Sequence, residues 1–158
     1  MTTRQIDHAC QGGSDVVHAD PKKKRAKRDT FPAAEKFADK MFALYIKARD
    51  RTCVTAGVRD SPCTNFLQCS HVERRRHKAT RYHPDNAYVQ CSACHVYHHT
   101  QSESPLRSYA IQKIGMEEMD NVYYASRKII KRTAEELRQI GIRYRDHAKL
   151  LESARRGV

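Results

Sequence analysis

Cys91 and Cys94, which are separated by two residues, are the strongest chemical signal in the sequence. Two thiolates at this spacing supply half of a tetrahedral zinc site, and the other two ligands must come from elsewhere in the chain. The first twenty residues lack the apolar stretch of a secretory signal, so we expect a cytoplasmic protein with reduced thiols. The six cysteines and nine histidines therefore favour metal ligation over disulfides, with buried, unligated thiols as the alternative.

The second half of the zinc site is less regular. Cys53 lies where another cysteine pair would begin, but Ala56 stands at the position of its mate. Cys63 and Cys69 are the possible replacements. We favour Cys63, because it lies in a loop that can fold back, and keep Cys69 as the alternative. The prediction is structural Zn²⁺ held by Cys53, Cys63, Cys91 and Cys94.

A second group of residues, His71, Asn86 and His95, could carry out hydrolysis of a phosphodiester. That reaction needs a base for water, a group that fixes the base or its surroundings, and a cation that neutralises phosphate charge. A neutral histidine is a suitable base near pH 7, and an asparagine amide can fix a ring or a backbone without adding charge. A histidine on the helix after the second strand, such as His95, can bind the cation.

The charge of the chain indicates a polyanionic partner. Its 158 residues carry 30 Lys and Arg against 18 Asp and Glu, for a formal net charge of +12. Part of the excess forms a basic run at residues 22–28, which fits a nuclear-import signal or an arm along phosphates. No apolar run is long enough to span a membrane, so we expect DNA as the partner. The predicted DNA contacts are Arg74, Arg75, Arg76, Lys78 and Arg81.

The elements that must position these residues follow from the pattern of apolar side chains. Helical spacing predicts a helix from Phe31 to about Arg49, with a proline in its first turn. Residues 67–72 and 87–90 are predicted strands, and residues 91–98 a helix. This strand–loop–strand–helix segment has too few apolar residues to fold unaided, which is a further reason to expect a metal.

The rest of the chain is predicted to be helical, with one helix at 104–114, a second at 116–131 and a third after Thr133. Thr133 and Glu136 fit a capping box. The apolar stripe from Leu137 to Leu151 favours packing within the chain, and a homodimer interface is the alternative. We divide the chain into a disordered basic arm at 1–30, a core at 31–103 and a helical extension at 104–158.

The central segment resembles the HNH nucleases of the ββα-metal fold and, more narrowly, the phage NinG/Rap family of recombination endonucleases. The resemblance covers residues 40–150 and rests on residues 45–55, 68–72 and 80–95, which include both cysteines of the Cys91–Cys94 pair. It implies a mostly helical α+β fold. A small zinc-stabilised ββα-metal (HNH-like) unit would be flanked by the N-terminal helix and the C-terminal helices.

The resemblance also implies a metal-dependent endonuclease that cuts branched or recombining DNA, such as Holliday junctions and D-loops, in a bacterial host cell. By position, His71 is the general base, Asn86 supports it, and His95 binds a catalytic Mg²⁺ or Mn²⁺. Two departures, Ala56 in the first cysteine pair and Ser70 where many HNH enzymes bind metal, favour an alternative. The alternative is a non-catalytic, zinc-stabilised module that binds nucleic acid.

His83 and Asp85 are candidates for a further ligand of the catalytic cation, although each is also typical of an ordinary loop.

A third interpretation of the whole chain is a small regulator that binds a host enzyme through its C-terminal helices. A symmetric DNA junction would favour a homodimer, because a two-fold substrate suits a two-fold protein.

Overall fold

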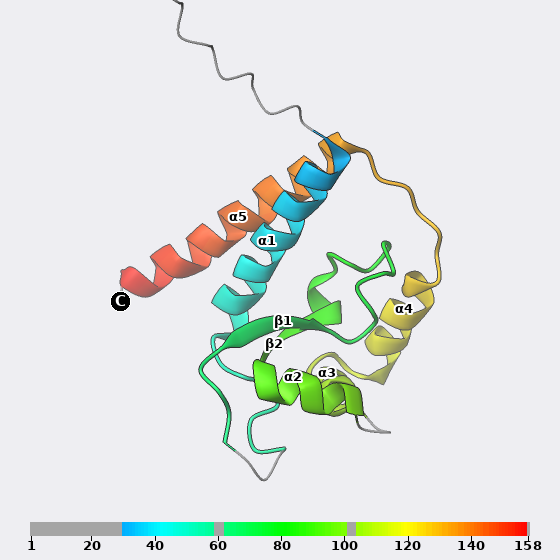
Figure 1. Ribbon diagram of the computed structural model, residues 1–158. Helices are drawn as coiled ribbons and strands as arrows, with labels where there is room; N and C mark the ends of the chain where they lie inside the picture. Colours follow the sequence, from blue (N-terminus) through cyan, green and yellow to red (C-terminus); the bar gives the residue numbers. More distant parts are fainter. Residues whose placement is uncertain (1–29, 59–61, 101–103, 158) are drawn as a thin grey trace, which may run out of the picture.

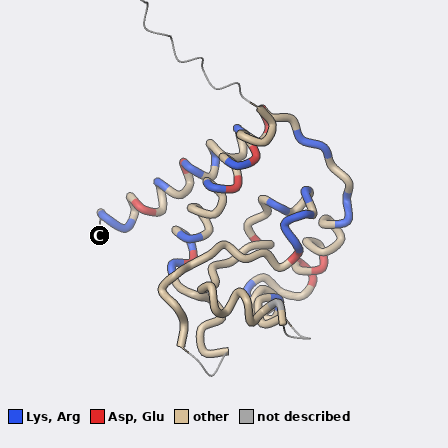
Figure 2. Tube along the Cα trace, in the orientation of Figure 1, with Lys and Arg blue, Asp and Glu red and all other residues tan. Residues whose placement is uncertain are grey.

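The computed structural model describes residues 30–58, 62–100 and 104–157, and is mostly helical with one two-stranded hairpin (Figure 1). The expected basic arm at 1–30 lies outside the described residues except for Thr30. Lysines and arginines occur along α5, in the segment after α4 and in the loop after β1 (Figure 2). Among the described helices, none is both long and apolar enough to cross a membrane.

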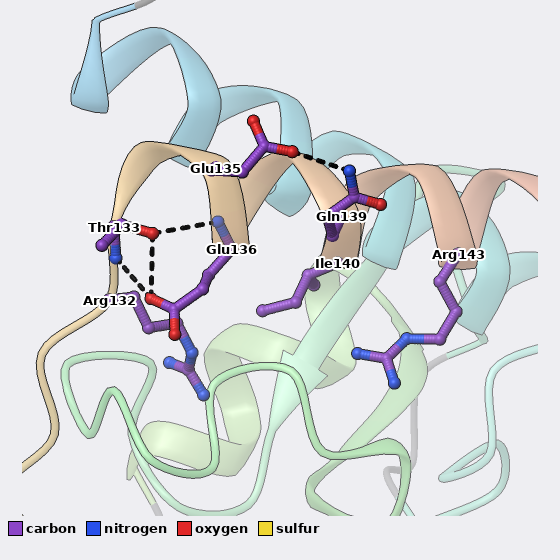
Figure 3. A pocket seen from close by; sticks show the side chains of 7 residues that line it. All are labelled: Arg132, Thr133, Glu135, Glu136, Gln139, Ile140 and Arg143. Carbon is purple, nitrogen blue, oxygen red and sulfur yellow. Dashed lines mark hydrogen bonds between the residues drawn. The ribbon is translucent and has the colours of Figure 1, made fainter.

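Two long helices, α1 (Phe31–Asp50) and α5 (Ala134–Arg156), lie side by side and run in the same direction (Figure 1). The predicted start of α5 is confirmed, because Thr133 and Glu136 form a reciprocal capping box (Figure 3). The helices approach closely at Gly141. A β-carbon there would lie 2.4 Å from the Phe37 ring, so a larger residue would force the helices apart.

The hairpin consists of β1 (Leu67–His71) and β2 (Ala87–Cys91), which pair antiparallel with His71 opposite Ala87. Both strands were predicted from the sequence within one residue at each end. A short 3-10 helix, η1 (Pro84–Asn86), leads directly into β2, and α2 (Ser92–Thr100) follows β2 without a loop. The strand–strand–helix order expected for the central segment is therefore confirmed.

The remaining helices, α3 (Pro105–Ile114) and α4 (Met116–Ser126), pack against each other. Ser104 caps α3, and Gly115 ends it with a φ of 87°, a left-handed conformation that favours glycine. The prediction that the next helix reaches residue 131 is wrong. After a turn at Arg127 and a bend at Lys128, the chain has no regular secondary structure as far as Thr133. Arg132 donates hydrogen bonds to the carbonyls of Lys78 and Ala79 and holds the segment against that loop.

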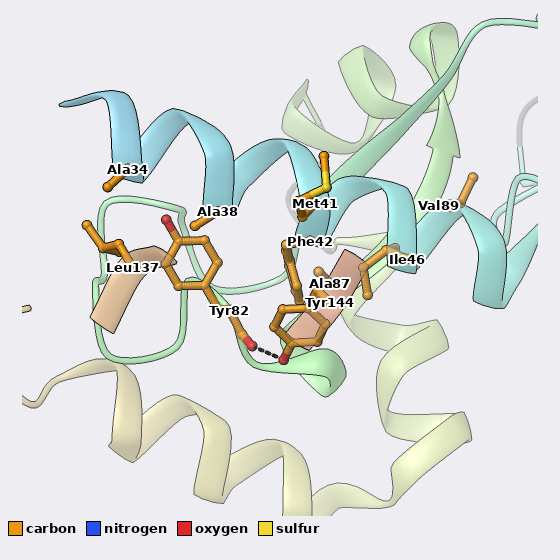
Figure 4. Close-up of a cluster of buried hydrophobic side chains, with 10 residues drawn as sticks. All are labelled: Ala34, Ala38, Met41, Phe42, Ile46, Tyr82, Ala87, Val89, Leu137 and Tyr144. Atoms are coloured by element: carbon orange, nitrogen blue, oxygen red, sulfur yellow. Dashed lines mark hydrogen bonds between the residues drawn. The ribbon is translucent and has the colours of Figure 1, made fainter. Parts of the chain in front are cut away.

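The main apolar core lies between α1, α5 and the hairpin (Figure 4). The Phe42 ring meets Tyr144 edge-on with 4.9 Å between ring centroids, and the Tyr144 hydroxyl donates to the carbonyl of Tyr82. Leu137 and Tyr144 are buried in this core, so most of the Leu137–Leu151 stripe packs within the chain. This confirms the favoured prediction that the stripe packs within the chain.

Candidate metal centre and active-site cleft

Four cysteines from three parts of the chain meet beside the hairpin. Cys53 lies shortly after α1, Cys63 in the loop before β1, Cys91 at the end of β2 and Cys94 in the first turn of α2. Their sulfur atoms all lie within 4.8 Å of one another. Cys53, Cys91 and Cys94 are buried, whereas Cys63 is exposed and closes the cluster from outside. The favoured choice of Cys63 as the fourth member is therefore confirmed.

The cluster fits a structural zinc ion. The Cys63 and Cys94 sulfurs are 3.8 Å apart. Zinc–sulfur bonds of about 2.3 Å place the sulfurs of a tetrahedral site about 3.8 Å from one another. Burial alone would keep the Cys91 thiol neutral, but hydrogen bonding, including a 3.4 Å bond from the Cys94 backbone N–H, lowers its pKa to about 6. This thiol therefore ionises readily, as a zinc ligand must.

Cys69, the alternative ligand, lies outside the cluster. Its position excludes it, because the Cys69 sulfur is not among the four that lie within 4.8 Å of one another. Burial raises the pKa of the Cys69 thiol to about 12. Its side chain instead packs beside the α1–α5 core and lines the cleft that contains His71. Cys53 is thus joined by Cys63 of the loop before β1 rather than by Cys69 of β1.

A cleft of about 520 Å³ lies beside β1 and brings His71 and His95 together. His71 is the last residue of β1 and His95 lies in the first turns of α2, which also packs on the hairpin. His98, one turn further along α2, is buried and lines the same cleft. The remaining lining residues are Cys69, Val72, Arg74 and Arg75. The cleft therefore combines imidazoles with two cationic side chains, a combination suited to a phosphodiester.

The ring of His71 is held in one tautomer. Its Nε2 lies 2.9 Å from the carbonyl oxygen of Arg81. Because a carbonyl oxygen only accepts hydrogen bonds, Nε2 carries the proton and the lone pair of the neutral ring lies on Nδ1. Burial lowers the pKa of His71 below its usual 6.5, so the ring is neutral at pH 7. A neutral, oriented imidazole is the form that can accept a proton.

Asn86 does not line the cleft; it is fully buried and holds the loop after β1. Its side-chain oxygen accepts a 2.7 Å hydrogen bond from the Glu73 backbone N–H. Its nitrogen donates to the carbonyls of Glu73 and Thr80 at 3.1 and 3.0 Å. Since Arg81 follows Thr80, Asn86 fixes the segment whose carbonyl orients His71. The expected supporting role of Asn86 therefore has a concrete route through the backbone.

His95 is oriented by a side chain of the neighbouring strand. Its Nδ1 lies 2.6 Å from the side-chain oxygen of Gln68, an acceptor, so Nδ1 carries the proton of the neutral ring. The lone pair of the neutral ring is then on Nε2. Histidines that bind metals usually donate their other N–H in this way. Gln68 was not predicted as a site residue, because its role depends on a contact across 27 residues.

The loop after β1 exposes four of the five predicted DNA contacts, Arg74, Arg75, Arg76 and Lys78. Arg74 and Arg75 also line the cleft, so their charges lie close to His71. Arg75 is 4.0 Å from the Asp39 carboxylate, but its side chain is 63% exposed, so water screens that pair. The loop can therefore attract phosphates to the mouth of the cleft.

Arg81 requires a correction to the predicted DNA contacts. Its side chain is buried, and its guanidinium donates to both carboxylate oxygens of Asp39, at 2.8 and 2.5 Å, and to Glu35 at 3.0 Å. Carboxylates on α1 thus already neutralise this cation. Arg81 attaches the loop to α1 and supplies the carbonyl that orients His71. We therefore assign it a structural role.

His83 and Asp85 meet a third residue, Glu118 of α4, and their ligand atoms lie within 4.8 Å of one another. None of the three lines the cleft that contains His71 and His95. The side chain of His83 also accepts a hydrogen bond from the Asp85 backbone N–H at the start of η1. The group can therefore hold η1 near α4, but it does not supply a second cation ligand in the cleft.

Arg49 is a further residue that sequence reasoning missed. Its guanidinium donates to the carbonyls of Pro84 and Ala87 at 2.9 and 2.7 Å, and it pairs with Asp50. Asp50 in turn accepts from the Val89 backbone N–H at 2.9 Å. The end of α1 therefore fixes η1 and β2, on which Asn86 and Cys91 depend. No local pattern distinguishes Arg49 from the other cations of this helix.

Comparison with known proteins places the chain in a family. The family model described as bacteriophage lambda NinG protein matches residues 14–154, which is most of the chain. Neither the comparison with curated proteins nor the comparison with solved structures found a match. The matched range includes the hairpin, all four clustered cysteines and the cleft histidines. The chain therefore belongs to the bacteriophage lambda NinG protein family.

Proposed function

We propose that this NinG-family protein is a metal-dependent HNH-type endonuclease that cuts branched or recombining DNA, such as Holliday junctions and D-loops. The observation that carries the proposal is the cleft in which His71 and His95 meet beneath the basic loop. The two histidines come from a strand and from the helix that follows its partner strand. The strand–strand–helix order and the two histidines in one cleft support the proposal.

His71 is the general base in this proposal. Its Nδ1 accepts a proton from water, which then attacks the phosphorus of the scissile phosphate. The Nε2–H bond to the Arg81 carbonyl prevents the ring from turning and stabilises the positive charge that develops on the imidazole. Asn86 keeps that carbonyl in place through the backbone around Thr80. The effect of Asn86 on the reaction is therefore one of positioning.

His95 would hold the catalytic cation, and Gln68 fixes its ring through Nδ1. Mg²⁺ or Mn²⁺, when bound there, supplies charge neutralisation at the phosphate and the leaving oxygen. Arg74 and Arg75 hold the flanking phosphates at the mouth of the cleft. Phosphate contacts carry no base code, so these residues favour recognition of DNA shape over sequence.

The proposal is tested by incubating zinc-loaded protein with linear, flapped and four-way DNA, with and without Mg²⁺ or Mn²⁺. We expect cleavage that requires the added ion and is greatest on branched DNA. His71→Ala should abolish cleavage while DNA binding stays near the wild-type level, because the side chain acts on the reaction rather than on attachment. His147→Ala, at an exposed histidine of α5, is the matched control and should cut normally.

Wild-type cleavage by His71→Ala would refute the assignment of the base. Cleavage that persists without any added ion would refute the role given to His95. We also propose that the protein acts as a homodimer on a symmetric junction, since two strands must be cut. Light scattering of the complex with junction DNA should then give the mass of one junction plus two chains, and one junction plus a single chain would contradict this part.

One observation favours the alternative, a non-catalytic zinc-stabilised module that binds nucleic acid. The described residues that line the cleft include no Asp or Glu, and Ser70, next to His71, is fully buried. A hard cation such as Mg²⁺ prefers carboxylate oxygens. The alternative predicts salt-sensitive DNA binding without metal-dependent cutting, so the cleavage assay above decides between the two.

A further inference from the structure

The segment between α4 and α5, residues 127–132, contains no helix or strand and forms a strap along one side of the molecule (Figures 1 and 2). Four of its six residues are cations and none is acidic; they are Arg127, Lys128, Lys131 and Arg132. From the sequence, residues 127–131 were predicted to be the end of a helix, with no function of their own. The structure shows a basic segment that neither the cleft nor the metal centre uses.

Arg132 attaches the strap to the basic loop. Its guanidinium donates hydrogen bonds to the carbonyls of Lys78 and Ala79 and lies 5.5 Å from the centre of the Tyr82 ring. The strap and the loop that carries Arg74 to Lys78 are therefore neighbouring parts of one surface. The attachment also explains how a segment without regular secondary structure keeps a defined position.

Lys128 and Lys131 are the exposed lysines of the strap, and neither forms an ion pair with a carboxylate within the described parts of the chain. Arg81 is the opposite case, because two acidic residues of α1 neutralise it. Neighbouring like charges repel each other, and a polyanion that neutralises them relieves the repulsion. The regular spacing of charge on DNA suits an extended row of cations.

We propose that the strap is a second phosphate-binding element for DNA, in which Lys128 and Lys131 contact the backbone beyond the part held by the loop at the cleft. Arg132 positions the strap and does not itself reach the DNA, because its guanidinium is engaged with the loop. The inference rests on the proposed function in taking DNA as the polyanion. It does not require that the protein cuts DNA.

The test compares two double variants that remove equal charge. Lys128→Gln with Lys131→Gln neutralises the strap, and Lys149→Gln with Arg156→Gln neutralises exposed cations towards the end of α5. Binding of a fluorescent four-way junction is measured over a range of salt concentrations without divalent ions, so that no cleavage occurs. Two lost phosphate contacts should make the slope of log K against log salt shallower by about two in the strap variant only.

A change of equal size in both variants would overturn the proposal, since it would reflect net charge alone. An unchanged slope in the strap variant would also overturn it. Ile129→Ser is a further control, because that side chain is 96% exposed and uncharged, and the slope should stay at the wild-type value.

A measurement on the wild-type protein avoids any effect of the variants on folding. Acetylation of lysines with and without junction DNA, read by mass spectrometry, should show protection of Lys128 and Lys131 but not of Lys149. Absence of protection at the strap would refute the proposal. A protein that shows this protection but never cuts DNA would refute the nuclease function and leave the strap assignment standing.

Discussion

The α1–α5 pair and the cysteine-anchored hairpin are held together by different forces. The helix pair buries aromatic and aliphatic side chains, with the rings of Phe42, Tyr45 and Tyr144 in contact. At the far end of the hairpin, the buried cluster consists of Cys53, Cys91 and Cys94, with only Leu67 and Ala93 packed against it. Hydrophobic stabilisation grows with apolar area, so it is substantial in the first region and small in the second.

This difference explains why a metal centre is needed where it is found. The cleft is built on the hairpin side, and α2, which carries His95, begins within the Cys91–Cys94 pair. His71 lies where the two regions meet, with its ring 5.9 Å from that of Phe42. The position of His71 therefore depends on the apolar core, whereas the position of His95 depends on the cysteines. Substitutions in the α1–α5 core and substitutions at the cysteine cluster should therefore have different effects.

The largest effect is expected from loss of the metal centre. Cys91→Ser should remove bound zinc, abolish cleavage and disorder the hairpin, because structural zinc contributes on the order of 10 kcal/mol in small zinc domains. Most of the helical circular dichroism should remain, since α1 and α5 pack without the metal. Zinc content and near- and far-ultraviolet circular dichroism measure this. Cys69→Ser, outside the cluster, should keep its zinc, and equal loss of zinc in both would contradict the assigned ligands.

The next prediction concerns a substitution in the apolar core between α1 and α5. Phe42 is 2% exposed, so Phe42→Ala leaves a cavity and should lower the free energy of unfolding by about 3–5 kcal/mol. Zinc content at low temperature should not change. Urea unfolding provides the measurement. Phe31→Ala, at an exposed position of the same helix, should cost far less, and an equal cost at the two positions would argue against the core described here.

A smaller effect is expected at the junction between the regions. Asn86→Ala leaves the Glu73 N–H and the Thr80 carbonyl without their partner, which should cost about 1–3 kcal/mol. Cleavage should fall by more than DNA binding does, since the carbonyl that orients His71 loses its support. Single-turnover cleavage and binding are measured together. Asn121→Ala, on the exposed face of α4, is the control, and matching losses in both variants would contradict the positioning role.

The smallest effect is a pH dependence from His71. Burial lowers its pKa in the folded protein, so the unfolded chain binds a proton at a higher pH than the folded protein does. Stability therefore gains a contribution above pH 6.5 that is lost as the pH falls from 6.5 through the lowered pKa. Denaturant unfolding of wild type and His71→Gln between pH 5 and 8 measures it. The variant should lose less stability on acidification, and parallel curves would refute the assignment.

The sequence predicted most of the elements because their signals are local. Thr133 and Glu136 marked the start of α5, and Gly115 marked the end of α3. Cys63 could be favoured as the fourth zinc ligand because its place in a loop, rather than on a strand, lets it approach the other cysteines. The early end of α4 could not be predicted, because it depends on Arg132 contacting a loop more than 50 residues away.

The site was predictable in its residue types but not in its contacts. His71, Asn86 and His95 could be chosen from order and spacing, yet the partners that fix them lie on other elements. Gln68 and Arg49 carry no signal in their neighbours along the chain. Arg81 was predicted to contact DNA because nothing in the sequence distinguishes it from the other cations of the basic loop. Only the position of Asp39 and Glu35 on α1 shows that one member points inward.

The parallel contact between α1 and α5 has a consequence for synthesis. Everything from β1 to α4 leaves the ribosome before the helix that covers α1 does, so the apolar face of α1 waits uncovered while the cysteine-bound hairpin can already form. Contacts between residues this distant in sequence form slowly. A nascent chain would therefore bring its cysteines together first and bury Phe42 last, so the ring of His71 would reach its final position only when α5 docks on α1.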